Sequence, residues 1–292
     1  MKTFLERLAA GETLVSDGAI GTNLQTLGLG LGVPPEEWVM DEPEKILALH
    51  RAFVDAGSDI ILTCTFGGTR IRLRESKYLE RTVELNQRAA QIACQAAQGR
   101  ALVAGSMGPT GLLVEPLGEL THNQVADAYA EQAAALEQGG VDLLLLETFF
   151  ALEEANAAID GAKRASKLPL VVSFSYDQAG KTMMGLTPSQ VARAMVPLGV
   201  AAIGANCGKS LEEMEKIVAE LAALNLGVPL WIKPNAGLPR MDGDRSVYDL
   251  TPAMMGEAIA RFVQMGARIV GGCCGNSPAH VAAIARAARQ RD

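Results

Sequence analysis

Eight short apolar runs, each followed by a longer amphipathic stretch, set the strongest constraint on how this chain can fold. The runs cover residues 13–19, 59–65, 101–107, 143–149, 170–175, 201–207, 229–235 and 268–274. Most are continuously apolar rather than alternating, which is typical of parallel strands covered on both faces. Eight strand–helix units in 292 residues predict a single (β/α)8 TIM barrel, one domain spanning residues 1–292.

The stretches between these runs carry helix signals. Residues 43–57 repeat apolar side chains at the helical period and end at a glycine. Ser210 and the threonines before proline, Thr187 and Thr251, are typical N-caps. An open doubly wound sheet is the alternative fold, but no strand and helix are joined by a GxGxxG fingerprint, which disfavours it.

Composition and charge exclude several classes of function. The formal net charge is −7 with no basic block, so we expect no nucleic-acid partner. No apolar stretch reaches the roughly 18 to 20 residues that a membrane helix needs, and the N-terminal residues lack a signal-peptide pattern. Five cysteines, an odd number without dense spacing, indicate reduced thiols rather than a disulfide framework. We therefore expect a cytoplasmic protein.

In a barrel of this kind the chemistry lies at the C-terminal ends of the strands. The residues at those ends are Asp17, Thr65, Met107, Glu147, Ser175, Cys207, Asn235, Cys273 and Cys274. Three of the five cysteines therefore share one rim. Cys64 should point away from it, and Cys94 lies in a helical stretch.

Three thiolates from two nearby strand ends suit zinc. About 66 residues separate Cys207 from Cys273, which is not the spacing of a zinc ribbon. Three protein ligands leave a fourth position where a substrate thiol can bind and stay deprotonated, which favours alkyl transfer to sulfur. The alternatives at this point are buried core cysteines and a disulfide between Cys273 and Cys274.

Seven motifs resemble, in order, those of the zinc-dependent homocysteine S-methyltransferases. They are "SDGAIGTNLQ", "AGSDIILTCTFGGTR", "GSMGPTG", "ETF", "GANCG", "KPNAGLP" and "GGCCGNSPAHVAAI". The family includes the homocysteine-binding barrel of cobalamin-dependent methionine synthase and betaine-homocysteine methyltransferase. The resemblance runs from about residue 12 to residue 286, and "GANC" with "GGCC" is its specific part.

The resemblance implies a metal site. Cys207, Cys273 and Cys274 match the family's catalytic Zn²⁺ ligands. Asn235 resembles a residue that fills the fourth position until homocysteine displaces it; the alternative is an asparagine that bonds only to backbone.

The resemblance also implies a substrate site. Asp17, with the backbone of Gly18 and Ala19, is similar to the holder of the substrate's amino-acid end, although Asp-Gly after a strand is otherwise a turn. Glu147 would pair with the substrate ammonium, or else form a structural ion pair with a lysine or arginine of a neighbouring strand. Thr65 would line the pocket.

The activity implied is methyl transfer to the thiolate of L-homocysteine, giving methionine. The donor stays open between methylcobalamin on a corrinoid protein, betaine, S-methylmethionine and S-adenosylmethionine. Because no corrinoid module follows residue 292, we expect methylcobalamin to arrive on another protein. The alternatives are a zinc-thiolate alkyltransferase for another thiol, a partner subunit serving a corrinoid protein, and a redox protein using a Cys273–Cys274 disulfide.

Two segments depart from a simple assignment. Cys64 stands in "TCTF" where the methionine synthase branch commonly has asparagine. Residues 107–124 form either a lid over the site or an ordinary surface loop.

Overall fold

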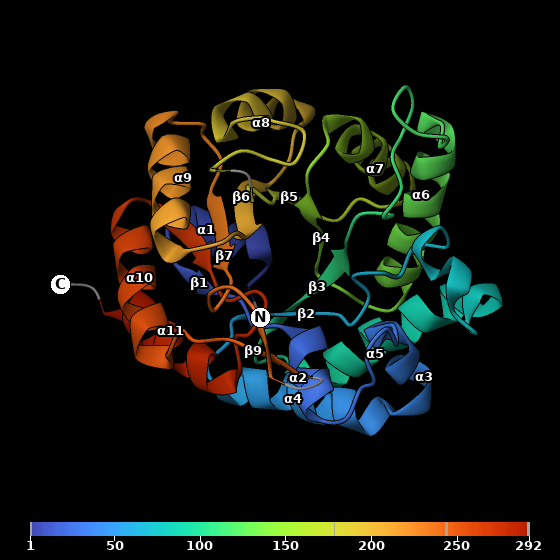
Figure 1. Cartoon of the computed structure of the whole chain (residues 1–292), viewed down its shortest axis with the longest axis horizontal. Coiled ribbons are helices and arrows are strands. Elements are labelled where there is room, and N and C mark those ends of the chain that lie inside the picture. Colours follow the sequence, from blue (N-terminus) through green and yellow to red (C-terminus); the bar gives the residue numbers. More distant parts are fainter. Residues whose placement is uncertain (1, 178, 243–244, 291–292) are drawn as a thin grey trace.

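The computed structural model describes residues 2–177, 179–242 and 245–290. Eight parallel strands surround a central interior and helices cover the outside (Figure 1). The strands are β1 Leu14–Val15, β2 Ile60–Leu62, β3 Leu102–Met107, β4 Leu143–Phe149, β5 Leu170–Phe174, β6 Ala202–Cys207, β7 Leu230–Pro234 and β10 Ala267–Val270. They pair in the order β1-β10-β7-β6-β5-β4-β3-β2. The predicted (β/α)8 barrel is confirmed.

The barrel closes between its two shortest strands, β1 and β2. Ser16 and Ile60 form an isolated parallel bridge there. The backbone N–H of Asp59 donates to the Val15 carbonyl at 2.7 Å. These contacts join the two ends of the strand order into a ring.

The helices begin where the sequence signals place them. Thr187, Ser210 and Thr251 each accept a hydrogen bond from the backbone three residues on, as predicted for N-caps. The α-helices are α1 Phe4–Ala9, α2 Ile20–Thr26, α3 Trp38–Asp41, α4 Pro43–Asp55, α5 Thr82–Ala97, α6 His122–Gln138, α7 Leu152–Ala165, α8 Pro188–Met195, α9 Leu211–Ala223, α10 Pro252–Gln264 and α11 Pro278–Arg289. Among the described residues, no helix combines the length and apolar character needed to cross a membrane.

Inside the barrel, alternate residues of each strand face inward, and their character changes along the strand. In β4, Leu143 and Leu145 belong to the apolar inner core and Glu147 follows them. In β7, Trp231 belongs to that core and Lys233 follows it. We call the buried polar residues at this level the polar layer: Asp17, Thr63, Ser106, Glu147, Ser173, Asn206 and Lys233.

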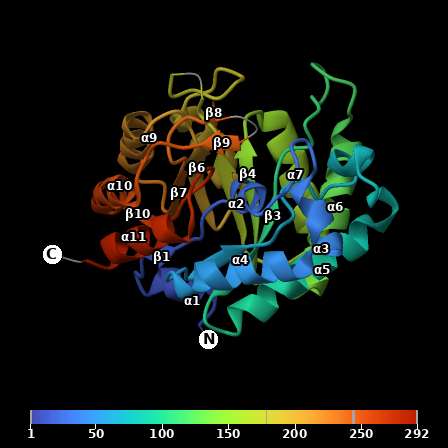
Figure 2. The same ribbon diagram turned by 60° about the horizontal axis from the view of Figure 1, so that its bottom comes forward.

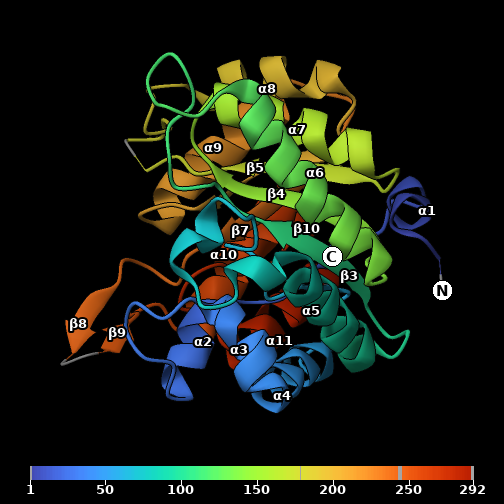
Figure 3. The same ribbon diagram turned by 90° about the vertical axis from the view of Figure 1, so that its right-hand side faces the viewer.

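The two ends of the barrel are covered differently. Helix α1 lies at one end, where Phe4 joins the apolar inner core. A hairpin of β8 Arg240–Asp242 and β9 Arg245–Val247 lies at the other end, as two views show (Figures 2 and 3). This hairpin, inserted after β7, has no counterpart in the predicted elements.

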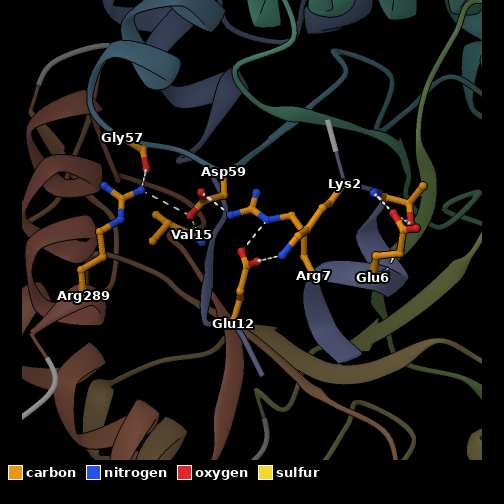
Figure 4. Close-up of polar contacts among 9 residues, drawn as sticks. Lys2, Glu6, Arg7, Glu12, Val15, Gly57, Asp59 and Arg289 are labelled. Carbon is orange, nitrogen blue, oxygen red and sulfur yellow. Dashed lines mark hydrogen bonds and ion pairs between the residues drawn. The ribbon is translucent and has the colours of Figure 1, made fainter. Parts of the chain in front are cut away.

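An ion network fastens α1 to the closing seam (Figure 4). Arg7 donates to Asp59 and to Glu12, both at 2.8 Å. Asp59 also accepts from the Val15 backbone at 2.9 Å, and Arg289 donates to the Gly57 carbonyl at 2.8 Å. The network therefore stabilises the end of the barrel opposite the hairpin.

One buried histidine makes the stability of the fold depend on pH. His50 of α4 is fully buried, and neither ring nitrogen has a hydrogen-bond partner among the described residues. Burial lowers the pKa of His50 from 6.5 to about 4. The unfolded chain, with the ordinary pKa, binds the proton more readily, so stability is lost as the pH falls from 6.5 through 4.

At pH 5 this difference costs about 2 kcal/mol relative to pH 7.5. We expect His50→Leu to lose less stability than the wild type between these pH values, as measured by urea denaturation. Carboxylates contribute equally to both proteins, so the difference between them isolates His50. The same loss in both proteins would show that His50 is not the group responsible.

Candidate metal and substrate site

Three cysteine side chains meet at the C-terminal rim of the barrel. Cys207 is the last residue of β6, and Cys273 and Cys274 follow β10. Their sulfurs all lie within 4.8 Å of one another, and those of Cys207 and Cys273 are 3.2 Å apart. All five cysteines are free thiols, and Cys64 and Cys94 lie outside the cluster. The structure thus brings together the three cysteines that the sequence placed at one rim.

The loop that carries two of these cysteines is shaped by close packing. A Cβ on Gly272 would lie 2.3 Å from the Asn276 side chain, so only glycine fits there. Asn276 donates from Nδ2 to the carbonyls of Pro234 and Cys273, both at 3.1 Å. The Cys273 backbone N–H donates to the Pro234 carbonyl at 2.8 Å. These bonds fix the cysteine loop against the end of β7.

Asn235 lies beside the cysteines with both ends of its amide bonded to backbone. Its Oδ1 accepts from the Cys274 N–H at 3.0 Å, and its Nδ2 donates to the Gly208 carbonyl at 3.0 Å. Asn235 therefore ties β7 to the loops that follow β6 and β10. The backbone-bonding role expected as one alternative is what the structure shows; metal ligation by Asn235 stays a proposal.

Hydrogen bonds among the three sulfurs change the pKa values of their thiols in opposite directions. Hydrogen bonds from Cys207 and then Cys273 lower the pKa of Cys274 to about 3, against the opposing effect of burial. Hydrogen bonding with Cys273 and Cys274, followed by burial, raises the pKa of Cys207 well above its usual value. Three adjacent thiolates would repel one another, so they need a cation between them. A soft sulfur donor set of this kind fits zinc.

A buried ion pair lies in the polar layer below the cysteines. Lys233 Nζ donates to Asp17 Oδ1 at 3.0 Å, and the two side chains are 2% and 0% exposed. The other oxygen of Asp17 accepts from the Leu62 backbone N–H at 2.8 Å. Burial alone would lower the pKa of Lys233, but Asp17 and then Glu147 outweigh it and hold that pKa above its usual value. Lys233 is therefore a protonated cation inside the barrel.

Glu147 is the second carboxylate of the polar layer. It ends the inward row of β4, and its Oε1 accepts from the Ser106 hydroxyl at 2.5 Å. Burial raises the pKa of Glu147 to about 7, while the charge of Lys233 opposes that rise. Both oxygens of Asp17 accept from protein groups, so Glu147 is the carboxylate better placed to accept from a substrate.

The remaining predicted pocket residues lie at the same end of the barrel. Thr65 is fully buried; its hydroxyl donates to the Ser106 carbonyl at 2.7 Å. The Ala19 N–H donates to the Asn276 carbonyl at 3.1 Å. A Cβ on Gly18 would lie 2.3 Å from that same carbonyl oxygen, so Gly18 permits the close approach of the β1 and β10 loops.

Residues 107–124 leave β3 and reach α6 through an extended loop. Val114 and Leu120 form an isolated bridge within it. Glu154 of α7 anchors its start, because Glu154 Oε1 accepts from the Thr110 N–H at 2.6 Å and from its hydroxyl at 2.7 Å. Leu117 near its middle is exposed. A lid role for this loop stays a proposal.

Three buried residues of this site were missed from the sequence: Ser106, Asn206 and Lys233. Lys233 carried a usable signal, since a lysine within the apolar run 229–235 stands two residues after Trp231 and faces the same interior. A charged residue at such a position requires a buried partner. Nothing in the sequence pattern specified which one.

Comparison with family models identifies the chain. The model described as homocysteine S-methyltransferase matches residues 14–288, which contain all eight barrel strands and the three cysteines. The chain belongs to the homocysteine S-methyltransferase family. The resemblance found in the sequence motifs is therefore confirmed.

Two similar proteins are much longer than this chain. The chain is 34% identical over 301 residues to a methionine synthase of Mycobacterium leprae (strain TN), covering 97% of this chain and 25% of that protein. It is 33% identical over 292 residues to a methionine synthase of Mycobacterium tuberculosis (strain ATCC 25618 / H37Rv), covering 94% and 24%. The chain thus spans about a quarter of the length of these relatives.

A solved structure has the same fold. The metallated form of the homocysteine methyltransferase MmuM from Escherichia coli superimposes with a TM-score of 0.81 at 23% identity, covering 96% of this chain and 98% of that one. Its apo form gives a TM-score of 0.75 at 22% identity, covering 96% and 97%. At 22% to 23% identity, this match supports the barrel fold.

Proposed function

We propose that this barrel transfers a methyl group to the sulfur of L-homocysteine, giving methionine, with zinc held by Cys207, Cys273 and Cys274. The observation that carries the proposal is the cluster of three sulfurs within 4.8 Å beside a buried layer with two carboxylates and a lysine. Membership of the homocysteine S-methyltransferase family supports homocysteine as the methyl acceptor.

The chain's own residues would bind and orient the acceptor. Zinc, when bound, would supply the positive charge that keeps the acceptor sulfur deprotonated. We propose that Glu147 accepts a hydrogen bond from the substrate ammonium, and that Asp17, held by Lys233, adds negative charge beside it. Gly18, Ala19 and Thr65 would line the amino-acid end. The acceptor sulfur supplies the electron pair of the new S–C bond. The bond between the methyl group and the donor breaks at the same time, and the electron pair of that broken bond leaves with the donor.

The methyl donor and any partner are a separate part of the proposal. The M. leprae and M. tuberculosis relatives are named methionine synthases, and this chain covers about a quarter of each. We propose a donor among methylcobalamin on a corrinoid protein, betaine, S-methylmethionine and S-adenosylmethionine. The three thiols must stay reduced to hold a metal, which supports a cytoplasmic location.

The function is tested by supplying the zinc-loaded protein with homocysteine and each small donor or free methylcobalamin, and measuring methionine by mass spectrometry. Methionine formation with one of them would support the transferase. Formation only after a corrinoid protein is added would make the chain a subunit that depends on that partner. No methionine under any of these conditions would contradict the proposal.

The variant Glu147→Gln tests whether homocysteine is the methyl acceptor. The variant keeps the shape and the hydrogen bond with Ser106 but loses the charge facing the ammonium. Since a hydrogen bond to a charged group contributes about 1.5 to 3 kcal/mol, we expect the KM for homocysteine to rise about tenfold to a hundredfold.

The matched substrate is 4-mercaptobutyrate, which is homocysteine without its amino group. Its transfer should be equally slow in the wild type and in Glu147→Gln. An unchanged homocysteine KM would indicate that the site is built for another thiol.

A further inference from the structure

Asn206, the residue before Cys207 in β6, is fully buried and bonded on every side. Its Oδ1 accepts from the Thr148 backbone N–H at 3.0 Å and from the Ser173 hydroxyl at 2.6 Å. Its Nδ2 donates to the Thr148 hydroxyl at 2.7 Å, to Cys207 Sγ at 3.4 Å and to Cys273 Sγ at 3.9 Å. One amide thus contacts two of the three clustered sulfurs.

The orientation of this amide is determined by its partners. The backbone N–H of Thr148 can only donate, so the amide oxygen of Asn206 must face it. The NH₂ group then faces the sulfurs of Cys207 and Cys273. One N–H bonds to the Thr148 hydroxyl, so the other N–H is shared between the two sulfurs. An N–H donor directed at ligand sulfurs fixes their orientation and reduces the electron density that they release.

Asn206 also holds two strained points of the backbone. Thr148 has φ 66° and Cys207 has φ 62°, values in the left-handed region that are uncommon for residues other than glycine. The pairing of β4 with β5 is irregular between Leu146 and Phe149, where Thr148 lies. The Thr148 N–H bonds to Asn206 at this irregularity. Asn206 therefore joins the end of β4, which carries Glu147, to the sulfur cluster.

We propose that Asn206 is a positioning residue of the methyl transfer, whose NH₂ group orients the Cys207 and Cys273 sulfurs toward a shared metal and whose oxygen fixes the strand end that carries Glu147. The proposal rests on the function proposed above. It adds that the metal-binding end and the ammonium-binding end of the site are kept at a fixed separation by one side chain.

Asn206→Asp is the most informative variant. It keeps the size of the side chain and the oxygen that accepts from Thr148 and Ser173, but it replaces both N–H donors with an oxygen that faces two sulfurs. Loss of such a partner lowers metal affinity by about 10-fold to 100-fold, so we expect that decrease in zinc affinity, measured by competition with a chelator.

A second readout follows the sulfurs themselves. In the cobalt-substituted protein, the sulfur-to-cobalt charge-transfer absorption should move to longer wavelength in Asn206→Asp, because sulfurs without N–H donors release electrons more easily. Asn206→Ser, which is neutral and short, should shift the absorption in the same direction and serves if the aspartate variant fails to fold.

Ser173→Ala is the matched control. It removes a hydrogen bond to the oxygen of Asn206 but leaves the donors to the sulfurs, so zinc affinity and cobalt absorption should stay at wild-type values. The proposal is overturned if both Asn206 variants behave as the wild type, if the aspartate binds zinc more tightly, or if Ser173→Ala gives the same shift. A wild-type protein that binds neither metal would contradict the proposed function as well, which distinguishes the two failures.

Discussion

Cys207→Ala is expected to abolish metal binding and methyl transfer together. The cluster would keep two sulfurs, Cys273 and Cys274, and would lose the one that β6 supplies. A metal contributes several kcal/mol to charge stabilisation in such sites, which corresponds to about a thousandfold in rate. We therefore expect zinc per chain to fall from about one to near zero, and methionine formation to fall by about that factor.

Cys94→Ala is the control for this experiment. Cys94 lies in α5 outside the cluster, and its sulfur contacts the Gly140 carbonyl at 3.2 Å. The same substitution there should leave zinc content and transfer unchanged. Equal zinc in the wild type and in Cys207→Ala, measured by elemental analysis, would mean that the three cysteines do not form the metal site.

Lys233→Met should produce the largest loss of stability of any substitution considered in this chain. The variant removes the cation from a fully buried ion pair and leaves Asp17 without its charge partner. Removing one partner of a buried ion pair lowers the free energy of unfolding by about 3 to 5 kcal/mol, because the other charge stays buried without a partner. Urea denaturation at a fixed zinc concentration should show this decrease in the free energy of unfolding.

Two further variants make this prediction specific. Lys233→Met combined with Asp17→Asn removes both charges, so it should recover a large part of the lost stability. Lys77→Met removes the same side chain from an exposed pair with Asp41, where Lys77 is 57% exposed, and should cost at most about 1 kcal/mol. If the single and double variants at Lys233 are equally unstable, the loss arises from packing rather than from the unpaired charge.

The barrel could be predicted from the sequence because burial on both faces leaves a simple pattern. Seven of the eight apolar runs contain one observed barrel strand each, and the eighth, residues 268–274, overlaps β10, which begins one residue earlier at Ala267. The predicted run 13–19 is only partly strand, since β1 ends at Val15 and Asp17 already bonds across to Leu62. Strand ends are set by such side-chain bonds, which hydrophobic patterning does not describe.

The cysteine cluster could also be predicted, because the fold brings the ends of parallel strands to one rim. The sequence could not predict which side chains of the polar layer bond to one another. Lys233 pairs with Asp17 across β10. This pairing depends on which inward side chains reach each other inside the closed barrel. The role of Asn206 depends on the left-handed backbone of Thr148, for which a threonine gives no signal.

The hairpin β8–β9 was missed for another reason. Its segment follows β7 with several charged residues and lacks the alternation typical of a strand, and Met241 of β8 is exposed.

The central claim is that the three clustered sulfurs hold the metal that activates the acceptor. The most direct measurement is a zinc titration of chelator-treated wild-type protein, with methionine formed from homocysteine as the readout. The account predicts no transfer without metal, a linear rise on adding zinc, and a plateau at about one zinc per chain. Full transfer by the metal-free protein would contradict it.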